Sequence, residues 1–304
     1  MTPPFITAAA VEGELDWRRM VAALEAGHRG PPPDLSDQFL HRGGDTLLSR
    51  AAWIDGQGIA VKSVSVLPEN PARGRPTVQG VMVLFNDETG AVDAVIESAL
   101  VTKWKTAADS VLGAKLLARA ESRRLLIVGT GAVARSLTEA YPAQFPGIEV
   151  QIWGRTAEKA MALAGECGAE PVQDLEAAVG AADIVATCTM SATPILRGAW
   201  LRPGQHIDLI GAFTARMREA DDEVLNRARI FVDSYDTTLE HIGELKIPLE
   251  AGTISRTDVL ADYYALVAGV SGRAGSDDIT FCKNGGGAHL DLMTARTILE
   301  AWRG

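Results

Sequence analysis

Residues 124–134 read Arg-Leu-Leu-Ile-Val-Gly-Thr-Gly-Ala-Val-Ala, and they constrain the fold of this chain more than any other stretch. The four apolar residues 125–128 predict a buried parallel strand. Gly129, Gly131 and Ala134 then follow at the spacing of a dinucleotide-binding turn, with Ala in the third small position. Glycine permits the tight turn and the close approach of a pyrophosphate, whose oxygens would face the N–H groups of the next helix. The turn predicts a nicotinamide or flavin cofactor.

The chain after this turn alternates between apolar strands and amphipathic helices. The expected strands are 149–153, a short one near Pro171, 184–187, 206–210 and 230–232, and the expected helices are 133–141, 157–167 and 175–179. This alternation predicts a doubly wound parallel sheet. The glycine turn alone also fits an ordinary strand-to-helix connection, but in this context we expect a Rossmann-type NAD(P)-binding domain over residues 121–277.

The flanking residues have a different pattern. Helical spacing over 16–28 predicts a first amphipathic helix. Short apolar runs separated by turn residues predict a mostly antiparallel sheet, with strands at 46–54, 59–67, 78–85 and 92–96. A long helix is expected over 99–119, and a strand at 279–281 precedes a final helix at 288–302. The predicted fold class is therefore α/β, with the Rossmann-type domain inserted into an α+β substrate and dimerisation domain formed by residues 1–120 and 278–304.

Composition limits the partners of the chain. With 304 residues, 47% of them hydrophobic, and a net charge of −10, it has the balance of a globular protein and lacks the basic surface that nucleic acid or an anionic membrane requires. No apolar run approaches the roughly 18 residues of a membrane span, and no signal peptide is evident. Cys167, Cys188 and Cys282 are widely spaced. We interpret them as reduced thiols of a cytoplasmic protein without a structural metal or disulfide.

The end of the second Rossmann strand predicts the cofactor. Residues 153–156 read Trp-Gly-Arg-Thr, so no carboxylate is available for an adenosine 2′-hydroxyl. Arg155 offers a guanidinium suited to a 2′-phosphate, and Thr156 can join it or cap the next helix. We therefore expect NADPH to be preferred, with NADH as the alternative cofactor, although an exposed Arg beside a capping Thr is the simpler interpretation.

Another group of candidate cofactor residues follows the strand 184–187, at the carboxyl edge of the sheet. Cys188 is expected to line the pocket, because no base that could make it a nucleophile is evident. The complete set of expected cofactor contacts is Thr106, Gly129, Thr130, Gly131, Ala132, Val133, Gly154, Arg155, Thr156, Cys188, Thr189 and Met190.

Several segments, in this order, resemble the ornithine cyclodeaminase/mu-crystallin family. They are 102–110, the turn at Gly129, 153–156, 193–195 and 203–207. The resemblance implies a Rossmann domain inserted into an N-terminal domain that carries a dimer interface, so we expect a homodimer. It also implies activity on imines and α-amino acids, because the family includes ornithine cyclodeaminases, alanine dehydrogenases and NAD(P)H-dependent reductases of cyclic ketimines.

Individual positions distinguish among these activities. Cyclodeaminases of the family carry an Asp just after the Gly that ends a Rossmann strand, and the matching residues 210–214 contain no acid. Segments 104–110 and 281–289 resemble most the bacterial ketimine reductases that convert Δ1-pyrroline-2-carboxylate to L-proline. We therefore expect reduction of a small anionic imine.

The predicted substrate residues are mainly cations. Lys62 lies among apolar residues of an expected strand and needs an anionic partner if it is buried; the resemblance also places the family's active-site Lys there, although an outward-facing lysine is the alternative. Arg50 is the second candidate for the substrate carboxylate, in competition with Arg42. The remaining candidates are Lys105, where many members of the family have Arg, and His289 as a proton donor, with Asp291 as the residue that orients His289 or Lys62.

Other functions remain open at this point. A different imine or keto acid is the nearest alternative: Δ1-piperideine-2-carboxylate, iminosuccinate, or pyruvate with ammonia as in alanine dehydrogenase. Ornithine cyclodeamination is another, and a non-enzymatic crystallin-like protein that binds NADPH or a small ligand is a third.

Overall fold

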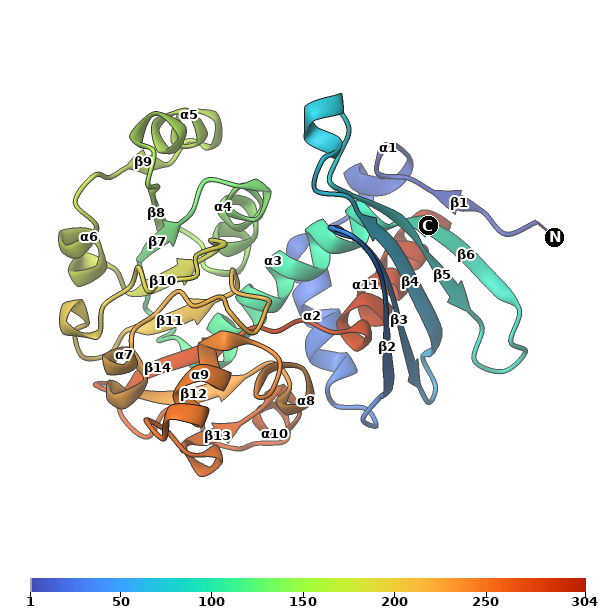
Figure 1. Cartoon of the computed structure of the whole chain (residues 1–304). Helices are drawn as coiled ribbons and strands as arrows, with labels where there is room; N and C mark the ends of the chain where they lie inside the picture. Colours follow the sequence, from blue (N-terminus) through green and yellow to red (C-terminus); the bar gives the residue numbers. More distant parts are fainter. Residues whose placement is uncertain (1) are drawn as a thin grey trace. The chain divides into compact units, whose positions relative to one another are not determined.

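The computed structural model describes residues 2–304 and divides the chain into two compact units. Unit 1 contains the residues up to Lys105 together with Gly287–Gly304, and unit 2 contains Thr106–Gly286 (Figure 1). The chain passes from one unit to the other within helix α3 (Ser98–Leu117) and again after strand β14 (Ile279–Lys283).

Unit 1 is a six-stranded sheet with helices, in the strand order β1-β6-β5-β4-β3-β2. Its strands are β1 (Phe5–Ile6), β2 (Asp34–Arg42), β3 (Asp45–Ile54), β4 (Gly58–Val66), β5 (Val78–Phe85) and β6 (Val92–Glu97), and its own helices are α1 (Ala8–Val11), α2 (Trp17–Gly27) and α11 (Ala288–Arg303). The short β1 is parallel to β6, and the other neighbours are antiparallel.

Alternation along the strands of unit 1 distinguishes the two faces of its sheet. On β4, Ala60, Lys62 and Val64 are buried, whereas the residues between them are half-buried. Helix α11 packs against β3, β4 and β5 and also against α2, so it contributes to burying this face. Helix α2 begins at the N-cap Asp16, whose carboxylate accepts a hydrogen bond from the N–H of Arg19 at 2.8 Å. The four strands and the first helix expected here are confirmed.

Strand β2 was missed from the sequence. Every residue of Asp34–Arg42 is exposed, so neither face is buried and no apolar alternation marks the strand. Only its pairing with β3, in the register Asp37 opposite Arg50, makes it part of the sheet.

Unit 2 is an eight-stranded parallel sheet flanked by helices, with the strand order β13-β12-β14-β11-β10-β7-β8-β9. Its strands are β7 (Arg124–Val128), β8 (Glu149–Trp153), β9 (Glu170–Pro171), β10 (Ile184–Thr187), β11 (His206–Leu209), β12 (Ala228–Val232), β13 (Val259–Ala261) and β14. Its helices after α3 are α4 (Ala132–Gln144), α5 (Ala157–Cys167), α6 (Leu175–Ala181), α7 (Asp222–Arg227), α8 (Tyr235–Thr238), α9 (Gly243–Ala251) and α10 (Tyr263–Val267).

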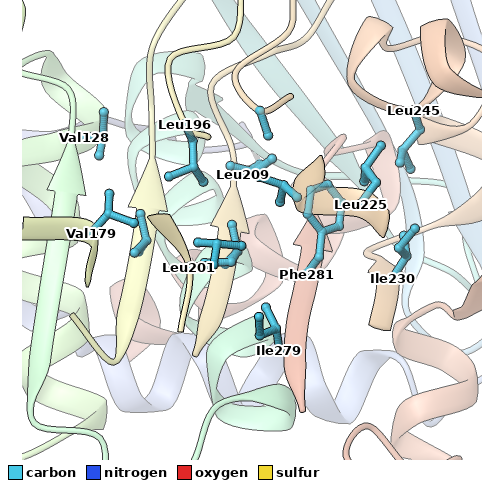
Figure 2. Packing of buried hydrophobic residues seen from close by; sticks show 14 of the residues in the cluster. Val128, Val179, Leu196, Leu201, Leu209, Leu225, Ile230, Leu245, Ile279 and Phe281 are labelled. Atoms are coloured by element: carbon cyan, nitrogen blue, oxygen red, sulfur yellow. The ribbon is translucent and has the colours of Figure 1, made fainter. Parts of the chain in front are cut away.

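The core of unit 2 corrects one expectation. Strand β14 was expected to belong with the final helix in the first domain, but it pairs with β11 and β12. Figure 2 shows Phe281 and Ile279 of β14 among the buried side chains of unit 2, together with Leu209 and Ile230 from the neighbouring strands. A fully buried side chain of this size contributes about 1.5–3 kcal/mol to stability, so burial places the strand in unit 2.

Candidate functional site

The glycine turn in unit 2 has the geometry that a dinucleotide requires. Gly129 follows the buried strand β7 with φ of 144°, a conformation that side chains disfavour. A Cβ at this position would lie 2.6 Å from the Sγ of Cys188. The N–H of Gly129 donates to the carbonyl of Trp153 at 2.9 Å and so connects the turn to the end of β8.

The next glycine leaves an open approach to the backbone. Gly131 is exposed, and no atom lies within 4 Å of the position that its Cβ would occupy. It is the N-cap of α4 and supplies no side chain to the N–H groups of the first turn, which contains Ala132 and Val133. Ala134 is fully buried. The residues present therefore fit a pyrophosphate at the N-terminus of this helix.

The end of β8 carries the candidate residues for the adenosine ribose. Arg155 is exposed, and Thr156 is the N-cap of α5 but makes no side-chain cap hydrogen bond. A Cβ on Gly154 would lie 2.5 Å from the Cγ2 of Thr130, so this close packing favours glycine. The guanidinium of Arg155 and the hydroxyl of Thr156 are thus both available to a phosphate.

The loop after β10 contains the third group of expected cofactor residues. Burial raises the pKa of Cys188, and the charges of Glu219 and Asp208 raise it further, so the thiol is not an activated nucleophile. Met190 is exposed, whereas the N–H and hydroxyl of Thr189 both donate to Glu219. Sequence reasoning missed Glu219, because nothing in its local pattern indicates a partner 30 residues earlier in the chain.

The predicted substrate cations gather in unit 1. Lys62 is buried, and its Nζ lies 2.6 Å from Oδ2 of Asp291 on α11. Arg50 on β3 is directly opposite Lys62 on β4. Its Nε donates to Oδ1 of Asp37 at 3.2 Å and its Nη2 to Oδ2 at 2.5 Å, so one edge of the guanidinium is held by the outer strand β2. Sequence reasoning did not identify Asp37.

The alternative arginine lies elsewhere. The side chain of Arg42, at the end of β2, is 86% exposed and pairs with Asp45. That of Arg50 is 20% exposed and shares the sheet register of Lys62. The geometry therefore brings Arg50, and not Arg42, together with the other cations.

Charges within unit 1 shift the pKa values of this cluster. Burial opposes ionisation of Asp291, but the positive charges of Lys62 and Lys105 outweigh it, so the pKa of Asp291 is below its ordinary value. Burial lowers the pKa of Lys62, and the repulsion of Lys105 and Arg50 acts in the same direction against the attraction of Asp291. The cluster combines one buried carboxylate with several cations, an arrangement that favours a further anion.

His289 lies beside this cluster in a neutral form. Burial lowers its pKa to about 3, with further contributions from His28 and Lys105. The rings of His28 and His289 meet edge to face with centroids 5.7 Å apart, and Nδ1 of His28 lies 2.7 Å from the carbonyl oxygen of Leu24. A neutral imidazole at neutral pH is a poor proton donor, which bears against the acid role expected for His289.

Two features define the class of protein: a Rossmann-type parallel sheet with a dinucleotide turn, and a second unit with a buried cationic cluster. The sequence profile of the ornithine cyclodeaminase/mu-crystallin family matches residues 39–304. The chain belongs to this family, as the sequence motifs indicated.

Individual relatives extend this result. A Δ1-pyrroline-2-carboxylate reductase from Paracoccus denitrificans is 51% identical over 99% of this chain and 98% of its own length. The structure of the Thermococcus litoralis Δ1-pyrroline-2-carboxylate reductase in complex with NADH and L-proline matches with a TM-score of 0.88 and 26% identity, covering 98% of this chain and 96% of that one. An archaeal alanine dehydrogenase dimer with bound NAD matches with a TM-score of 0.91 and 28% identity over 99% and 96%. These likenesses confirm the α/β Rossmann-type fold.

Proposed function

We propose that this protein is an NADPH-dependent ketimine reductase that converts Δ1-pyrroline-2-carboxylate to L-proline. The observation that carries the proposal is the buried Lys62–Asp291 pair with Arg50 in register beside it. A cyclic imine with a carboxylate next to its C=N group offers an anion for these cations and a nitrogen for a nearby acid. The Paracoccus and Thermococcus relatives, which carry this activity in their names, support the same substrate.

The charges indicate how the substrate carboxylate is held. Asp37 occupies Nε and Nη2 of Arg50 and fixes the plane of the guanidinium. Lys105 contributes a second positive charge that acts on the same buried Asp291. With the carboxylate fixed by these cations, the imine carbon is held in one orientation, and such preorganisation lowers the barrier to the reaction.

Lys62 is our candidate for the proton donor. Reduction adds a hydride to the imine carbon and a proton to the nitrogen, and a nicotinamide bound by unit 2 supplies the hydride. The lowered pKa of Lys62 makes its ammonium a better acid than a lysine in water. Asp291, 2.6 Å away, orients the ammonium group.

The residue after Gly211 argues against cyclodeamination. That residue is Ala212, which is buried and follows β11 at the position where cyclodeaminases of the family have an acid. The methyl group of Ala212 cannot act as the base that the ammonium groups of ornithine require, so we favour reduction.

We also propose a preference for NADPH over NADH. Arg155 and Thr156 present a guanidinium and a hydroxyl at the end of β8, and residues 153–156 include no carboxylate. A 2′-phosphate is the adenosine group that this pair recognises best.

A second copy of the chain is the proposed partner of the sheet in unit 1. The face opposite Lys62 bears apolar side chains that are exposed or half-buried, namely Leu47, Ala51, Trp53, Ile59, Val61, Val81, Val83 and Phe85. Exposed apolar side chains gathered on one face of a sheet are typical of a protein interface. The archaeal alanine dehydrogenase is a dimer, which supports an assembly of two chains.

We place the protein in the cytoplasm, where its three free cysteines would stay reduced. Among residues 2–304, no helix is both long and apolar enough to cross a membrane.

One assay tests the reaction. Oxidation of NADPH is followed with Δ1-pyrroline-2-carboxylate, Δ1-piperideine-2-carboxylate, iminosuccinate, and pyruvate with ammonia. We expect the highest kcat/KM for the five-membered ring. For the six-membered ring we expect a kcat/KM lower by roughly 10–200-fold, because one methylene changes the binding free energy by about 1–3 kcal/mol. Tight NADPH binding without turnover of any of these compounds would instead indicate a binding protein.

A further inference from the structure

Two exposed apolar side chains follow neighbouring strands of the unit 2 sheet. Met190, 76% exposed, comes after β10, and Phe213, 60% exposed, comes after β11. These strands are parallel neighbours, so their carboxyl ends lie at one edge of the sheet. The two loops are far apart in the sequence, and no sequence motif indicates that they lie close together.

The strand order assigns these loops to one half of a dinucleotide. The order reverses between β7 and β10, where ligands bind in sheets of this type. The glycine turn and Arg155 follow β7 and β8, on the adenosine side of this point. We therefore expect the nicotinamide half to lie against the loops after β10 and β11.

One buried carboxylate holds both loops. The Oε1 of Glu219 accepts hydrogen bonds from the N–H and the hydroxyl of Thr189, each at 2.7 Å. Its Oε2 accepts from the N–H groups of Gly211 at 2.8 Å and Ala212 at 3.2 Å. Each oxygen thus serves one loop, and Glu219 is fully buried, so these bonds do not compete with water.

The two loops meet at Gly211 without space for a side chain. A Cβ there would lie 2.1 Å from the carbonyl oxygen of Thr189, 2.3 Å from its nitrogen and 2.5 Å from Oε1 of Glu219. Any larger residue must therefore move one loop away from the other.

The backbone of Glu219 is itself fixed by a second buried acid. The carboxylate of Glu244 accepts hydrogen bonds from the N–H groups of Glu219 at 2.7 Å and Ala220 at 3.0 Å. Glu244 lies on α9, so this helix of unit 2 fixes the backbone at Glu219.

We propose that Glu219 is a positioning residue that sets the spacing of the loops carrying Met190 and Phe213, and thereby places the nicotinamide ring for hydride transfer. The proposal rests on the nicotinamide cofactor of the proposed function. Glu219 acts through Thr189 and Gly211 and does not touch the reacting atoms. The turn at Gly129 and Arg155 would hold the ADP-ribose half, and neither Gly129 nor Arg155 is among the hydrogen-bond partners of the Glu219 carboxylate.

The variant Glu219→Gln separates the two halves of the cofactor. Gln keeps the size of the side chain but replaces one carboxylate oxygen by an NH2 group. The N–H groups of one loop then face a donor in place of an acceptor, and their hydrogen bonds to residue 219 are lost. We expect the Kd for 2′-phospho-ADP-ribose, which lacks nicotinamide, to stay within about twofold of wild type. The Kd for NADPH rises about tenfold and kcat falls roughly 100-fold, because a displacement near 1 Å has such effects on catalysis.

Two further variants complete the test. Gly211→Ala keeps Glu219 but forces the loops apart, so it should show the same selective loss of NADPH binding. Glu250→Gln on α9 removes an exposed ion pair with Lys246 and serves as the matched control, with wild-type values throughout.

The outcomes are distinct. Equal loss of both ligands in Glu219→Gln would mean that Glu219 only supports the scaffold, and wild-type NADPH affinity and kcat would likewise overturn the proposal. A wild-type protein that binds NADPH but reduces no imine would overturn the proposed function alone, because the comparison of the two ligands would still decide the role of Glu219.

Discussion

Arg50 and Lys62 are direct partners across the antiparallel strands β3 and β4, so two cations stand side by side on the sheet of unit 1. Like charges in this position destabilise a sheet unless anions compensate them. Asp37 compensates Arg50 from β2, and Asp291 compensates Lys62 from α11. The strands thus hold a cationic pair that an anionic substrate can join.

The first prediction concerns Lys62. We expect Lys62→Ala to lower kcat/KM for Δ1-pyrroline-2-carboxylate by a factor of ~100 or more, on the order of 3 kcal/mol, because proton donation and a substrate charge are lost together. Steady-state kinetics with saturating NADPH measure this change. A near-normal kcat/KM would place Lys62 outside the site.

Stability must be separated from catalysis in this variant. Lys62→Ala leaves Asp291 as a buried charge without its ion-pair partner, which costs about 3–5 kcal/mol. In Lys62→Ala with Asp291→Asn the uncompensated charge is gone, so the free energy of unfolding should recover while activity stays low. Lys246→Ala, which removes an exposed pair with Glu250, should change neither quantity.

The second prediction concerns His289 and pH. Burial lowers the pKa of His289 to about 3 in the folded chain. In the unfolded chain the same imidazole binds a proton near pH 6.5, at which the folded chain keeps it neutral. The contribution of His289 to the free energy of unfolding is therefore fully present above about pH 6.5. It is lost as the pH decreases toward 3, by up to about 1.4 kcal/mol per pH unit. Denaturant unfolding at pH 7 and pH 5 should show a smaller pH dependence in His289→Asn.

The activity of this variant tests the role of the imidazole. Since His289 is neutral, the pH profile of kcat/KM between pH 6 and 8 should keep its shape in His289→Asn. Loss of a profile limb near pH 6.5 would instead identify His289 as the acid. His241→Asn, at an exposed position, is the matched control for both measurements.

The third prediction concerns the cofactor. Arg155→Ala should raise the KM for NADPH roughly 10–100-fold, because hydrogen bonds to a charged phosphate contribute about 1.5–3 kcal/mol. The KM for NADH should stay the same. Arg124→Ala, at the opposite end of the sheet strands, is the control. Unchanged affinity for NADPH in Arg155→Ala would remove the argument for a 2′-phosphate site.

The fourth prediction concerns the second copy of the chain. Val81→Glu introduces a charge on the apolar face of unit 1, and we expect the molar mass from light scattering to fall from dimer to monomer. Val78 lies on the same strand but on the other face, and it is also exposed. Val78→Glu should therefore remain a dimer, and a dimer in both variants would place the interface elsewhere.

Much of this protein was accessible from local sequence patterns. Four consecutive apolar residues before Gly129, and regular alternation after it, identified the parallel sheet because strand burial and tight turns depend on neighbours in the chain. The exposed strand β2 gave no such signal, since neither of its faces is buried.

Only the tertiary structure decided which residues act together. The sequence identified Lys62 and Arg50 as candidates, but the strand register makes them partners and brings in Asp37. Strand β14 belongs to unit 2 because it is hydrogen-bonded to β11 of the parallel sheet, although α11 of unit 1 follows it directly in the sequence. Glu219 connects two loops through backbone N–H groups, which every residue except proline carries, so no residue type in those loops could indicate the contact. Local patterns determine strands and turns, whereas pairing between distant segments requires the folded chain.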